Sequence, residues 1–374
     1  MRILQICKLY NPWIGGVEEV AKKIAEGVHS LGGVESIVLC CQPKGKYDQT
    51  KINEIQVNRA ASLGMLWGMP ISFDFLKRFR RLSKTVDVID LHIPFPLADL
   101  AVLLTKPNAK LVVHYHADIV RQKILKPLFG PLIRNTLKRA DFIVVSSPNL
   151  IESSKYLKNF KEKCKVINFG LDVKEYACAN PEQINTLIAR YGDFTLFVGR
   201  MSYYKGVDFL INAIKSTSGN LVLVGTGPEE SRMKNLVKKL ELKDRVIFLK
   251  NQSNAELINL FHAAQVMVLP SIYRSEAFGL VLLEAMACGT PVISTELGTG
   301  TSWVNKHNET GIVVPPSNVS VLADAINRIA KDKQLRQRLG EGAKMRATYD
   351  FSMSNMIFSI AKLYNIPIAE SKIV

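Results

Sequence analysis

Short apolar segments alternate with longer segments of helical spacing along most of this 374-residue chain. In the first half, the segments with strand character are Arg2–Leu9, Ser36–Cys41, Val86–Ile93, Lys110–His116 and Phe142–Ser146. In the second half, they are Phe194–Val198, Asn220–Val224, Arg245–Leu249, Val266–Leu269 and Pro291–Ser294. Parallel strands need a crossover between them, and that crossover is usually a helix. The alternation therefore predicts an α/β protein whose parallel sheets are covered by helices on both faces.

The alternation is interrupted between residues 171 and 180, where the chain is polar and irregular before Pro181 begins a new helix. A length of 374 residues also exceeds one ordinary domain and suits two domains of about 180 residues each. We therefore predict one Rossmann-like domain over residues 1–175 and a second over residues 176–350. A last helix is expected within residues 351–374, after a pause in the pattern.

The composition narrows the class of protein. Apolar residues make up 47% and charged residues 22% of the chain, which is typical of a globular protein and not of a disordered one. The sequence has no run of 18 apolar residues, so no transmembrane helix is expected. It begins with a strand pattern in place of a signal peptide, and its six cysteines lack metal-ligand spacing. We expect a cytoplasmic protein with free thiols and no metal site.

Two common nucleotide-binding classes are disfavoured. The segment Gly225–Glu230 (GTGPEE) follows a predicted strand, but it lacks the third glycine of a dinucleotide-binding loop. The next strand ends at Lys250, whereas such enzymes carry an acidic residue near this position to bind the ribose. The chain also contains no GxxxxGK[ST] segment. These features argue against a nicotinamide-dependent dehydrogenase and against a P-loop NTPase.

Glycines and cations lie between predicted strands and helices, where anions bind. Gly15 and Gly16 connect the first strand to the first helix, either as a plain tight turn or as a place where backbone N–H groups approach an anion. Gly199 and Arg200 end a strand, and Lys205 precedes the following helix. Two cations on one loop suit a diphosphate, although they are also compatible with an ordinary solvated loop.

The charge-poor segment Ser275–Gly289 carries two carboxylates, Glu276 and Glu284. If the segment is one helix, eight residues bring both side chains to roughly the same side. A buried carboxylate is costly unless it accepts hydrogen bonds, and sugar and ribose hydroxyls supply such donors. The helix dipole alone would explain a carboxylate at the start of the helix, but not Glu284.

Taken together, these segments resemble the retaining glycosyltransferases of the GT-B fold, family 4. The spacing of Glu276 and Glu284 in EAFGLVLLEAMACGTPVI resembles the E-x7-E signature of that family. The glycine loop at Gly15, the pair Arg200 and Lys205, and the segment VGTGPEE match further family elements. The resemblance spans the whole chain. It implies two Rossmann-like domains facing across a cleft, with a C-terminal helix that crosses back to the N-terminal domain.

The resemblance also implies roles for individual residues. Arg200 and Lys205 would neutralise the donor diphosphate in place of a metal ion, Glu276 would hydrogen-bond the transferred sugar, and Glu284 would bind the ribose. The donor site would be completed by Gly15, Gly16, Gly199, Gly227, Lys250, Asn251, Phe278, Gly279 and Leu280.

His116, at the end of a predicted strand in HYHAD, matches a family histidine that points into the cleft. A hydrogen-bonded core histidine is the alternative, but the strand-end position and the nearby Asp118 favour a site. His114 is expected to be structural.

The implied reaction is transfer of a hexose from a nucleotide-diphosphate sugar with retention of configuration. The leaving diphosphate would deprotonate the incoming hydroxyl, and no metal cofactor is expected. The segments HYHADIVRQK and ELGTGTSWVNKHNETG look like those of bacterial surface-polysaccharide enzymes that use GDP-mannose or a related GDP-sugar. We therefore expect a lipid-linked oligosaccharide acceptor in O-antigen biosynthesis. A UDP-hexose transferase of the same fold, or a non-catalytic membrane scaffold, are the alternatives.

Much of the net charge of +16 lies between residues 73 and 139, which hold 13 basic and 5 acidic side chains. An amphipathic basic helix follows the apolar segment 60–73, a pattern typical of a peripheral membrane segment on anionic lipid. The residues expected to contact the membrane or acceptor are Trp67, Lys77, Arg78, Arg80, Arg81, Arg121 and Lys123. Basic solvent-facing helices are the alternative. Nucleic acid is disfavoured because no recognition motif is present. We expect the protein at the inner face of the cytoplasmic membrane.

Overall fold

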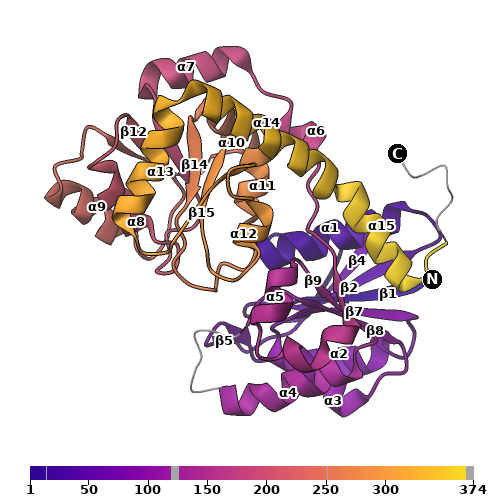
Figure 1. Cartoon of the computed structure of the whole chain (residues 1–374). Coiled ribbons are helices and arrows are strands. Elements are labelled where there is room, and N and C mark those ends of the chain that lie inside the picture. The colour runs from indigo at the N-terminus through magenta and orange to yellow at the C-terminus, as the bar shows by residue number, and fades with distance from the viewer. Residues whose placement is uncertain (14, 119–125, 251, 368–374) are drawn as a thin grey trace. The chain divides into compact units, whose positions relative to one another are not determined.

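The computed structural model describes residues 1–13, 15–118, 126–250 and 252–367 and contains two compact units (Figure 1). The first unit comprises residues 1–169 together with the chain from Ser354 onward, and the second comprises Gly170–Met353. Each unit has a predominantly parallel sheet flanked by helices, so the predicted α/β architecture with two Rossmann-like domains is confirmed.

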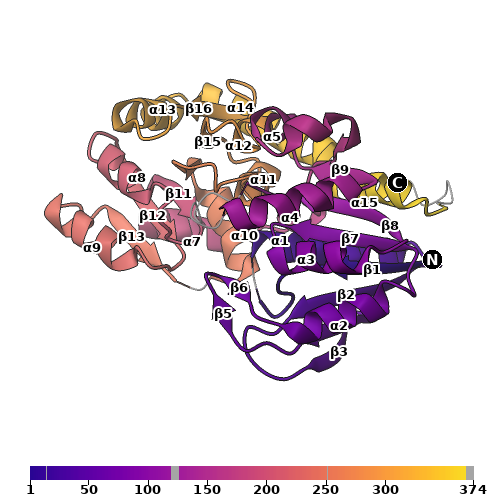
Figure 2. The ribbon, with the colours of Figure 1, turned by 90° about the horizontal axis from the view of Figure 1, so that it is seen from below.

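The sheet of the first unit has eight strands in the order β10-β9-β8-β7-β1-β2-β4-β3, and only the β3–β4 pairing is antiparallel. The strands are β1 (Arg2–Ile6), β2 (Glu35–Cys41), β3 (Asp48–Ile52), β4 (Ile55–Ala60), β7 (Val88–Ile93), β8 (Lys110–Tyr115), β9 (Phe142–Val145) and β10 (Cys164–Val166). A separate hairpin consists of β5 (Met65–Leu66) and β6 (Met69–Pro70), set apart from this sheet in Figure 2.

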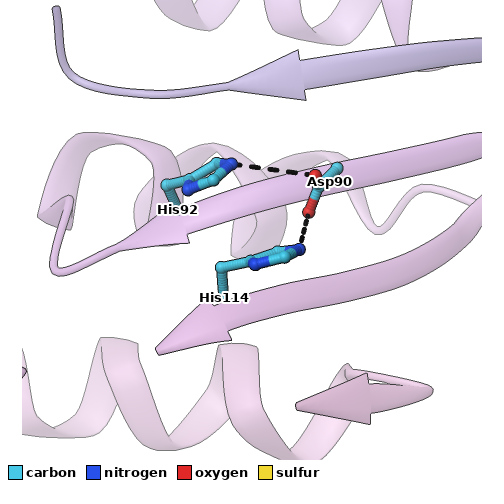
Figure 3. Close-up of side chains that lie close together, drawn as sticks. All are labelled: Asp90, His92 and His114. Atoms are coloured by element: carbon cyan, nitrogen blue, oxygen red, sulfur yellow. Dashed lines mark ion pairs between the residues drawn. The ribbon is translucent and has the colours of Figure 1, made fainter. Parts of the chain in front are cut away.

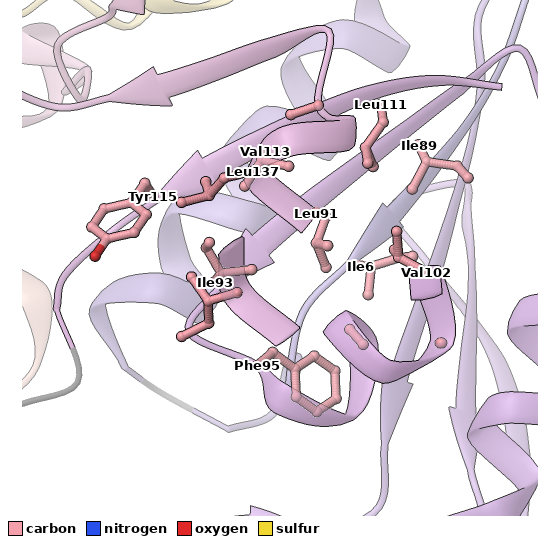
Figure 4. Close-up of a cluster of buried hydrophobic side chains, with 14 of the residues drawn as sticks. Ile6, Ile89, Leu91, Ile93, Phe95, Val102, Leu111, Val113, Tyr115 and Leu137 are labelled. Atoms are coloured by element: carbon pink, nitrogen blue, oxygen red, sulfur yellow. The ribbon is translucent and has the colours of Figure 1, made fainter. Parts of the chain in front are cut away.

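Helices of the first unit cover its sheet. They are α1 (Gly16–Ser30), α2 (Phe73–Leu82), α3 (Pro96–Thr105), α4 (Lys126–Arg139), α5 (Pro148–Ser153), the 3-10 helix η2 (Leu157–Lys163) and α15 (Met353–Tyr364). On β7, the odd-numbered residues Ile89, Leu91 and Ile93 pack in the apolar cluster with Phe95 and Val102 of the α3 region (Figure 4). Successive side chains of a strand alternate between faces. The even-numbered residues of β7 therefore lie on the opposite face of the sheet.

The sheet of the second unit has six parallel strands in the order β13-β12-β11-β14-β15-β16. These are β11 (Phe194–Val198), β12 (Asn220–Val224), β13 (Val246–Leu249), β14 (Val266–Leu269), β15 (Val292–Thr295) and β16 (Gly311–Val314). The helices are α6 (Val173–Tyr176), α7 (Pro181–Tyr191), α8 (Val207–Ile214), α9 (Glu230–Lys239), α10 (Asn254–Ala263), α11 (Leu280–Ala287), α12 (Thr301–Val304), α13 (Val319–Lys331) and α14 (Lys333–Asp350).

The strand order of each unit reverses once. In the second unit, β11 lies between β12 and β14, and in the first unit, β1 lies between β2 and β7. Open parallel sheets bind ligands beyond the carboxyl ends of the strands at such a switch point. A ligand site is therefore expected at the loops after β11 and β14 in the second unit. In the first unit, it is expected at the loops after β1 and β7.

The boundaries between the units differ from the predicted ones at 175 and 350. Leu171 N donates to Phe351 O at 2.8 Å, and Met353 N donates to Leu171 O at 3.0 Å, so the two connecting segments run side by side. A Cβ on Gly170 would lie 2.6 Å from Met353 Cα, which shows how closely they approach. Both paired segments belong to the second unit, so the boundaries between the units lie at 169/170 and 353/354.

The C-terminal helix α15 packs on the first unit, as expected. Tyr364 donates a hydrogen bond to Asp90 of β7, and a Cβ on Gly27 of α1 would lie 2.3 Å from Ile357 Cδ1. The apolar segment 60–73 contains the β5–β6 hairpin, which was not predicted. Strands β3, β4, β10 and β16 were also not predicted, and the segment 171–180 holds the short helix α6.

Candidate active site

Lys205 and Glu276 form a buried ion pair at the switch point of the second sheet. Lys205 Nζ lies 2.6 Å from Glu276 Oε2, and Ser271 Oγ donates to the same carboxylate oxygen at 3.0 Å. Lys205 comes from the loop after β11, and the other two residues come from the loop after β14. Burial lowers the pKa of Lys205, but the Glu276 carboxylate, together with Tyr204 and Glu284, raises the pKa above its ordinary value. The lysine therefore stays charged inside the protein.

The prediction that Glu276 and Glu284 share one face of a helix is wrong. Helix α11 begins at Leu280, so Glu284 is helical while Glu276 lies in the preceding loop. The loop ends at Gly279, whose φ of 82° is left-handed. Thr299 Oγ1 donates to the Glu276 carbonyl at 2.8 Å and helps to hold this loop. Glu276 therefore reaches Lys205 from a loop, which helical spacing does not predict.

The loops after β11 and β12 cross at very short range. A Cβ on Gly225 would lie 2.3 Å from Gly199 O, and a Cβ on Gly227 would lie 2.4 Å from Met201 O. Met201 N donates to Thr226 O at 3.0 Å across the same contact. Side chains would separate the two loops, so the glycines permit this backbone packing.

These two loops border a cavity of about 700 Å³ in the second unit. It is lined by Val198, Gly199, Arg200, Val224, Gly225, Thr226, Gly227, Pro228, Gln252 and Leu257. Arg200 is exposed, so its guanidinium is accessible to a ligand there. The volume lies within the range of small-molecule sites.

The other residues predicted for the donor site differ in their exposure and in their contacts. Lys250 is exposed and pairs with Glu230, at 3.6 Å between Nζ and Oε1, while Asn251 lies outside the described residues. Phe278 is buried, and its ring meets that of Phe351 at 6.0 Å between centroids. Leu280 is the first residue of α11. Phe278 therefore helps to build the core beneath the loop.

Gly15 and Gly16 lie at the beginning of α1, as predicted. Gly15 is the N-cap, it offers no side chain to cap the first turn, and Gly16 is the first helical residue. A Cβ on Gly15 would lie 2.3 Å from Glu18 Oε2. The Glu18 carboxylate therefore occupies the space beside the glycine, where an anion would have to displace it.

His116 follows β8 in the first unit and joins a chain of buried polar groups. Its Nε2 lies 2.8 Å from His92 Nδ1, and His92 Nε2 lies 2.6 Å from Gln5 Nε2. The His116 ring also stacks on Phe169 at 5.5 Å between centroids. Burial, together with His92 and His114, lowers the pKa of His116 well below its ordinary value, so the ring is neutral.

Asp90 lies among the histidines, as Figure 3 shows. Its Oδ1 is 2.9 Å from His114 Nε2, and its Oδ2 is 3.7 Å from His92 Nε2. Burial alone would raise the pKa of Asp90, but His114 and His92 hold it well below the usual range. The carboxylate is therefore ionised in a buried setting, which confirms a structural pairing for His114.

Asp90, His92 and His114 also form the group that most resembles a metal site in the described residues. Their possible ligand atoms lie within 4.8 Å of one another. Neighbouring protein groups already engage both nitrogens of His92, through Gln5 and His116, and one oxygen of Asp90, through Tyr364. The donor set fits a hydrogen-bonded network.

Asp118 was expected to support His116, but its carboxylate is engaged elsewhere. Ser154 Oγ donates to Asp118 Oδ1 at 2.6 Å, and the Tyr115 hydroxyl donates to the same oxygen. These bonds hold Asp118 at the loop after β8. The side chain that contacts His116 is His92, which comes from the neighbouring strand.

Comparisons with known proteins decide the family. Residues 14–175 match the model described as Glycosyltransferase Family 4, and residues 184–346 match that described as Glycosyl transferases group 1. The O-antigen chain mannosyltransferase C of Escherichia coli is 34% identical over 374 residues, with 100% of each chain covered. The chain belongs to the family 4 glycosyltransferases.

Two further proteins resemble this glycosyltransferase. The D-rhamnosyltransferase WbpZ of Pseudomonas aeruginosa is 36% identical over 348 residues, which cover 92% of this chain and 91% of that protein. The crystal structure of Anabaena HepE in complex with UDP-glucose has a TM-score of 0.79 at 20% identity, with 98% of this chain and 99% of that chain covered. The GT-B fold and the glycosyltransferase activity expected from the sequence are confirmed.

The glycosyltransferase carries an exposed apolar surface on the β5–β6 hairpin and the beginning of α2. Trp67, at the tip of the hairpin, is 63% exposed, Leu63 is 72% exposed and Phe73 is 76% exposed. Met65, Leu66 and Ile71 are also exposed. We call these six residues the hairpin patch. No helix within the described residues is long and apolar enough to span a membrane.

The basic residues of α2 divide into two groups. Lys77, Arg80 and Arg81 are exposed, which is compatible both with a membrane contact and with a solvent-facing helix. Arg78 instead pairs with Asp74 at 2.7 Å and lies over the Tyr47 ring, 3.1 Å from its centroid, so it is a structural residue. Arg121 and Lys123 lie outside the described residues.

Sequence reasoning missed several residues that the glycosyltransferase places near the predicted ones. Gln5, Asp90 and His92 are fully or almost fully buried polar residues on apolar strands, and Ser271 contacts Glu276. A signal was present, because Asp90 and His92 are two residues apart and therefore point to the same face of the strand. Polar residues repeating with this period in a buried strand indicate a network on one face.

Proposed function

We propose that this glycosyltransferase moves a mannose from GDP-mannose, with retention of configuration, onto a lipid-linked oligosaccharide in bacterial O-antigen biosynthesis. Two relatives that align with over 90% of the chain support this assignment. One is named an O-antigen chain mannosyltransferase and the other a D-rhamnosyltransferase. Both names describe transfer of a hexose or deoxyhexose, which supports a hexosyl donor here.

The Lys205–Glu276 pair is the observation that carries the proposal. A buried ion pair contributes little net stability, and well-packed apolar residues often replace one without loss. Neither residue lines the cavity itself, but a Cβ on Gly199, which does, would lie 3.7 Å from Lys205 Nζ. A buried lysine and carboxylate this close to an open cavity suit ligand binding. We assign the Lys205 ammonium to the donor diphosphate and the Glu276 carboxylate to a hydroxyl of the transferred sugar.

The reaction follows from these contacts. The bond between the anomeric carbon and the diphosphate oxygen breaks as the acceptor oxygen bonds to the same face of that carbon. The acceptor proton passes to the departing diphosphate, which leaves as a nucleoside diphosphate. Arg200 and Lys205 stabilise the negative charge that develops on the leaving group, and no metal ion is needed for this charge.

A UDP-hexose is the second candidate donor. HepE of Anabaena, which shares the fold, is bound to UDP-glucose. The base would lie in the second unit after β13, near the exposed Lys250 and the half-buried Gln252, and these side chains do not distinguish guanine from uracil. Thermal-shift measurements with GDP, UDP, GDP-mannose and UDP-glucose test the choice. Stabilisation by UDP compounds alone would replace the GDP assignment, and stabilisation by neither would contradict the donor site.

We also propose that the first unit binds an anionic membrane that carries the acceptor. The hairpin patch provides apolar side chains for the lipid interface, and Lys77, Arg80 and Arg81 on α2 provide adjacent positive charge. Aromatic residues with neighbouring cations are typical of interfacial segments. The protein would then act at the cytoplasmic face of the inner membrane, where the nucleotide-sugar donor meets the lipid-linked acceptor.

A further inference from the structure

Five polar side chains lie together inside the first unit, on the face of the sheet opposite the apolar cluster of Figure 4. They are Gln5, Asp90, His92, His114 and His116, and none is more than 6% exposed. From the sequence, only His116 of these five residues was expected to face the substrate. Buried polar groups are costly unless they are mutually satisfied, so the direction of each hydrogen bond in this set is constrained.

The hydrogen bonds of Gln5 determine which groups donate in this network. Gln5 Nε2 lies 3.4 Å from the carbonyl oxygen of Ala21 and 2.6 Å from His92 Nε2. A carbonyl oxygen only accepts, so the amide group facing Ala21 is the NH₂ group, which only donates. Gln5 therefore donates to His92 Nε2, and the neutral His92 ring carries its hydrogen on Nδ1.

The same direction continues to His116. His92 Nδ1 lies 2.8 Å from His116 Nε2, and the hydrogen between them belongs to His92. His116 Nε2 is therefore an acceptor, so the neutral His116 ring carries its hydrogen on Nδ1. Burial lowers the pKa of both rings, which supports their neutral forms.

Asp90 does not accept a hydrogen bond from His92 Nε2, so it does not change the donor and acceptor roles of His92. Its Oδ2 lies 3.7 Å from His92 Nε2, which is too long for a hydrogen bond. The carboxylate is compensated instead by His114, at 2.9 Å from Oδ1, and by the hydroxyl of Tyr364, which donates to Oδ2. His114 and Tyr364 thus compensate the charge of Asp90, and His92 Nε2 accepts the hydrogen bond from Gln5.

We propose that Gln5 and His92 are positioning residues that fix His116 in the tautomer with hydrogen on Nδ1, so that His116 acts toward the substrate as a hydrogen-bond donor and not as a base. The natural acceptor is an oxygen, such as a hexose hydroxyl. This inference rests on the proposed function and on the sequence-based expectation that His116 points toward the substrate. It assigns roles to Gln5 and His92, which sequence patterns did not single out.

The ¹⁵N NMR spectrum of histidine-labelled protein tests the tautomer directly. The His116→Asn variant identifies the His116 signals by their loss. In the wild type, we expect a protonated Nδ1 and an unprotonated Nε2 at His116. In Gln5→Glu, the carboxylate accepts from His92 Nε2–H, so both rings reverse and His116 carries its hydrogen on Nε2. We expect kcat/KM to fall about 100-fold in this variant.

Two more variants separate the role of the Gln5 amide from the effect of adding a carboxylate. Gln5→Leu adds no buried charge, and it frees His92 to adopt either tautomer, so His116 should show a mixture. Gln334→Glu makes the same change at an exposed position and should alter neither the spectrum nor kcat/KM. A wild-type His116 protonated on Nε2, or an unchanged spectrum in both Gln5 variants, would overturn the proposal.

Activity measurements separate this proposal from the proposed function. If the tautomer reverses in Gln5→Glu while kcat/KM stays at the wild-type value, then Gln5 and His92 do not position His116 for the reaction. If the wild type transfers no hexose from any nucleotide sugar, the proposed function fails. The NMR result still decides whether Gln5 and His92 fix the ring.

Discussion

Lys205 Nζ lies 2.6 Å from Glu276 Oε2, although the two residues are 71 positions apart in the chain. The strand order brings them together, because β11 and β14 are neighbours at the point where the order of the sheet reverses. Ser271 completes the contact by donating to the same carboxylate oxygen. In the proposed reaction, this pair separates when the donor binds, and each charge gains a ligand partner.

Removal of Lys205 should affect both activity and stability. In Lys205→Met, the leaving diphosphate loses a cation, so we expect kcat/KM to fall by roughly 10²- to 10³-fold. The buried Glu276 carboxylate also loses its partner, which should lower the free energy of unfolding by about 3–5 kcal/mol. Steady-state kinetics and urea denaturation measure the two effects.

A double variant separates these effects. Lys205→Met combined with Glu276→Gln leaves no unpaired charge, so stability should return toward the wild type while activity stays low. Lys243→Met, at an exposed lysine of the same unit, is the matched control and should change neither quantity. Activity that recovers together with stability would show that the ion pair is only structural.

Arg200 should behave differently from Lys205 because its side chain is exposed. We expect Arg200→Ala to lower kcat/KM by roughly 10²-fold or more through loss of diphosphate stabilisation, with little change in unfolding free energy. Thermal denaturation and kinetics on the same preparation test this. Wild-type kcat/KM in Arg200→Ala would remove Arg200 from the donor site.

Gly225 should tolerate no side chain. A Cβ there would lie 2.3 Å from Gly199 O, and its φ of 123° is unfavourable for other residues. We expect Gly225→Ala to lower Tm by several degrees and to weaken donor binding by separating the two loops. Gly130→Ala is the control, because a Cβ there meets only ordinary contacts, at 3.5 Å from the Tyr156 hydroxyl. Equal Tm values for the two variants would contradict the loop-packing argument.

Asp99 should make stability depend on pH. Burial raises its pKa to about 7, whereas an unfolded chain ionises near pH 4. The folded protein therefore keeps a proton that the unfolded chain loses, so the Asp99 contribution to stability falls as pH rises from about 4 to about 7. Asp99→Asn removes this term. Between pH 4 and pH 8, the stability of the variant relative to the wild type should rise by about 4 kcal/mol.

Urea denaturation of Asp99→Asn and the wild type at both pH values checks this difference. A constant difference between the two proteins would show that Asp99 titrates at its ordinary pKa in the folded state. The comparison between the two proteins cancels the contributions of the buried histidines, which both chains share.

Membrane binding should depend on the hairpin patch and on α2. We expect Trp67→Ala with Phe73→Ala, or Arg80→Glu with Arg81→Glu, to reduce co-sedimentation with anionic vesicles at least tenfold. Binding should also weaken as salt increases. Arg328→Glu, on α13 of the second unit, is the charge control and should bind normally. Failure of the wild type to bind anionic vesicles at low salt would contradict the proposed membrane contact.

Much of the fold was predictable because buried parallel strands are continuous apolar runs. Phe194–Val198, Asn220–Val224 and Val266–Leu269 were predicted with the bounds that the structure has. Strand β3 (Asp48–Ile52) was not, because an edge strand with the sequence DQTKI has too few apolar residues to show a strand pattern. Edge strands are commonly polar, so they are not predicted from runs of apolar residues.

The candidate site was predictable only in part. Lys205 and Glu276 were both expected, but a pattern along the chain does not show that two loops meet, and so their pairing was missed. Likewise, His116 was expected, whereas Gln5 and His92 acquire their meaning only when β1, β7 and β8 pair as neighbours. Strand order is a long-range property, and contacts that depend on it need the folded chain.

The central claim is that this chain is a retaining hexosyltransferase with a nucleotide-diphosphate sugar donor. The most direct test is incubation with GDP-mannose and a polyprenyl-diphosphate-linked oligosaccharide, followed by NMR determination of the anomeric configuration of the product. We predict a mannosylated product with the α configuration of the donor and release of GDP. A β-linked product would contradict retention, and transfer from UDP-hexoses but not from GDP-mannose would contradict the assigned donor.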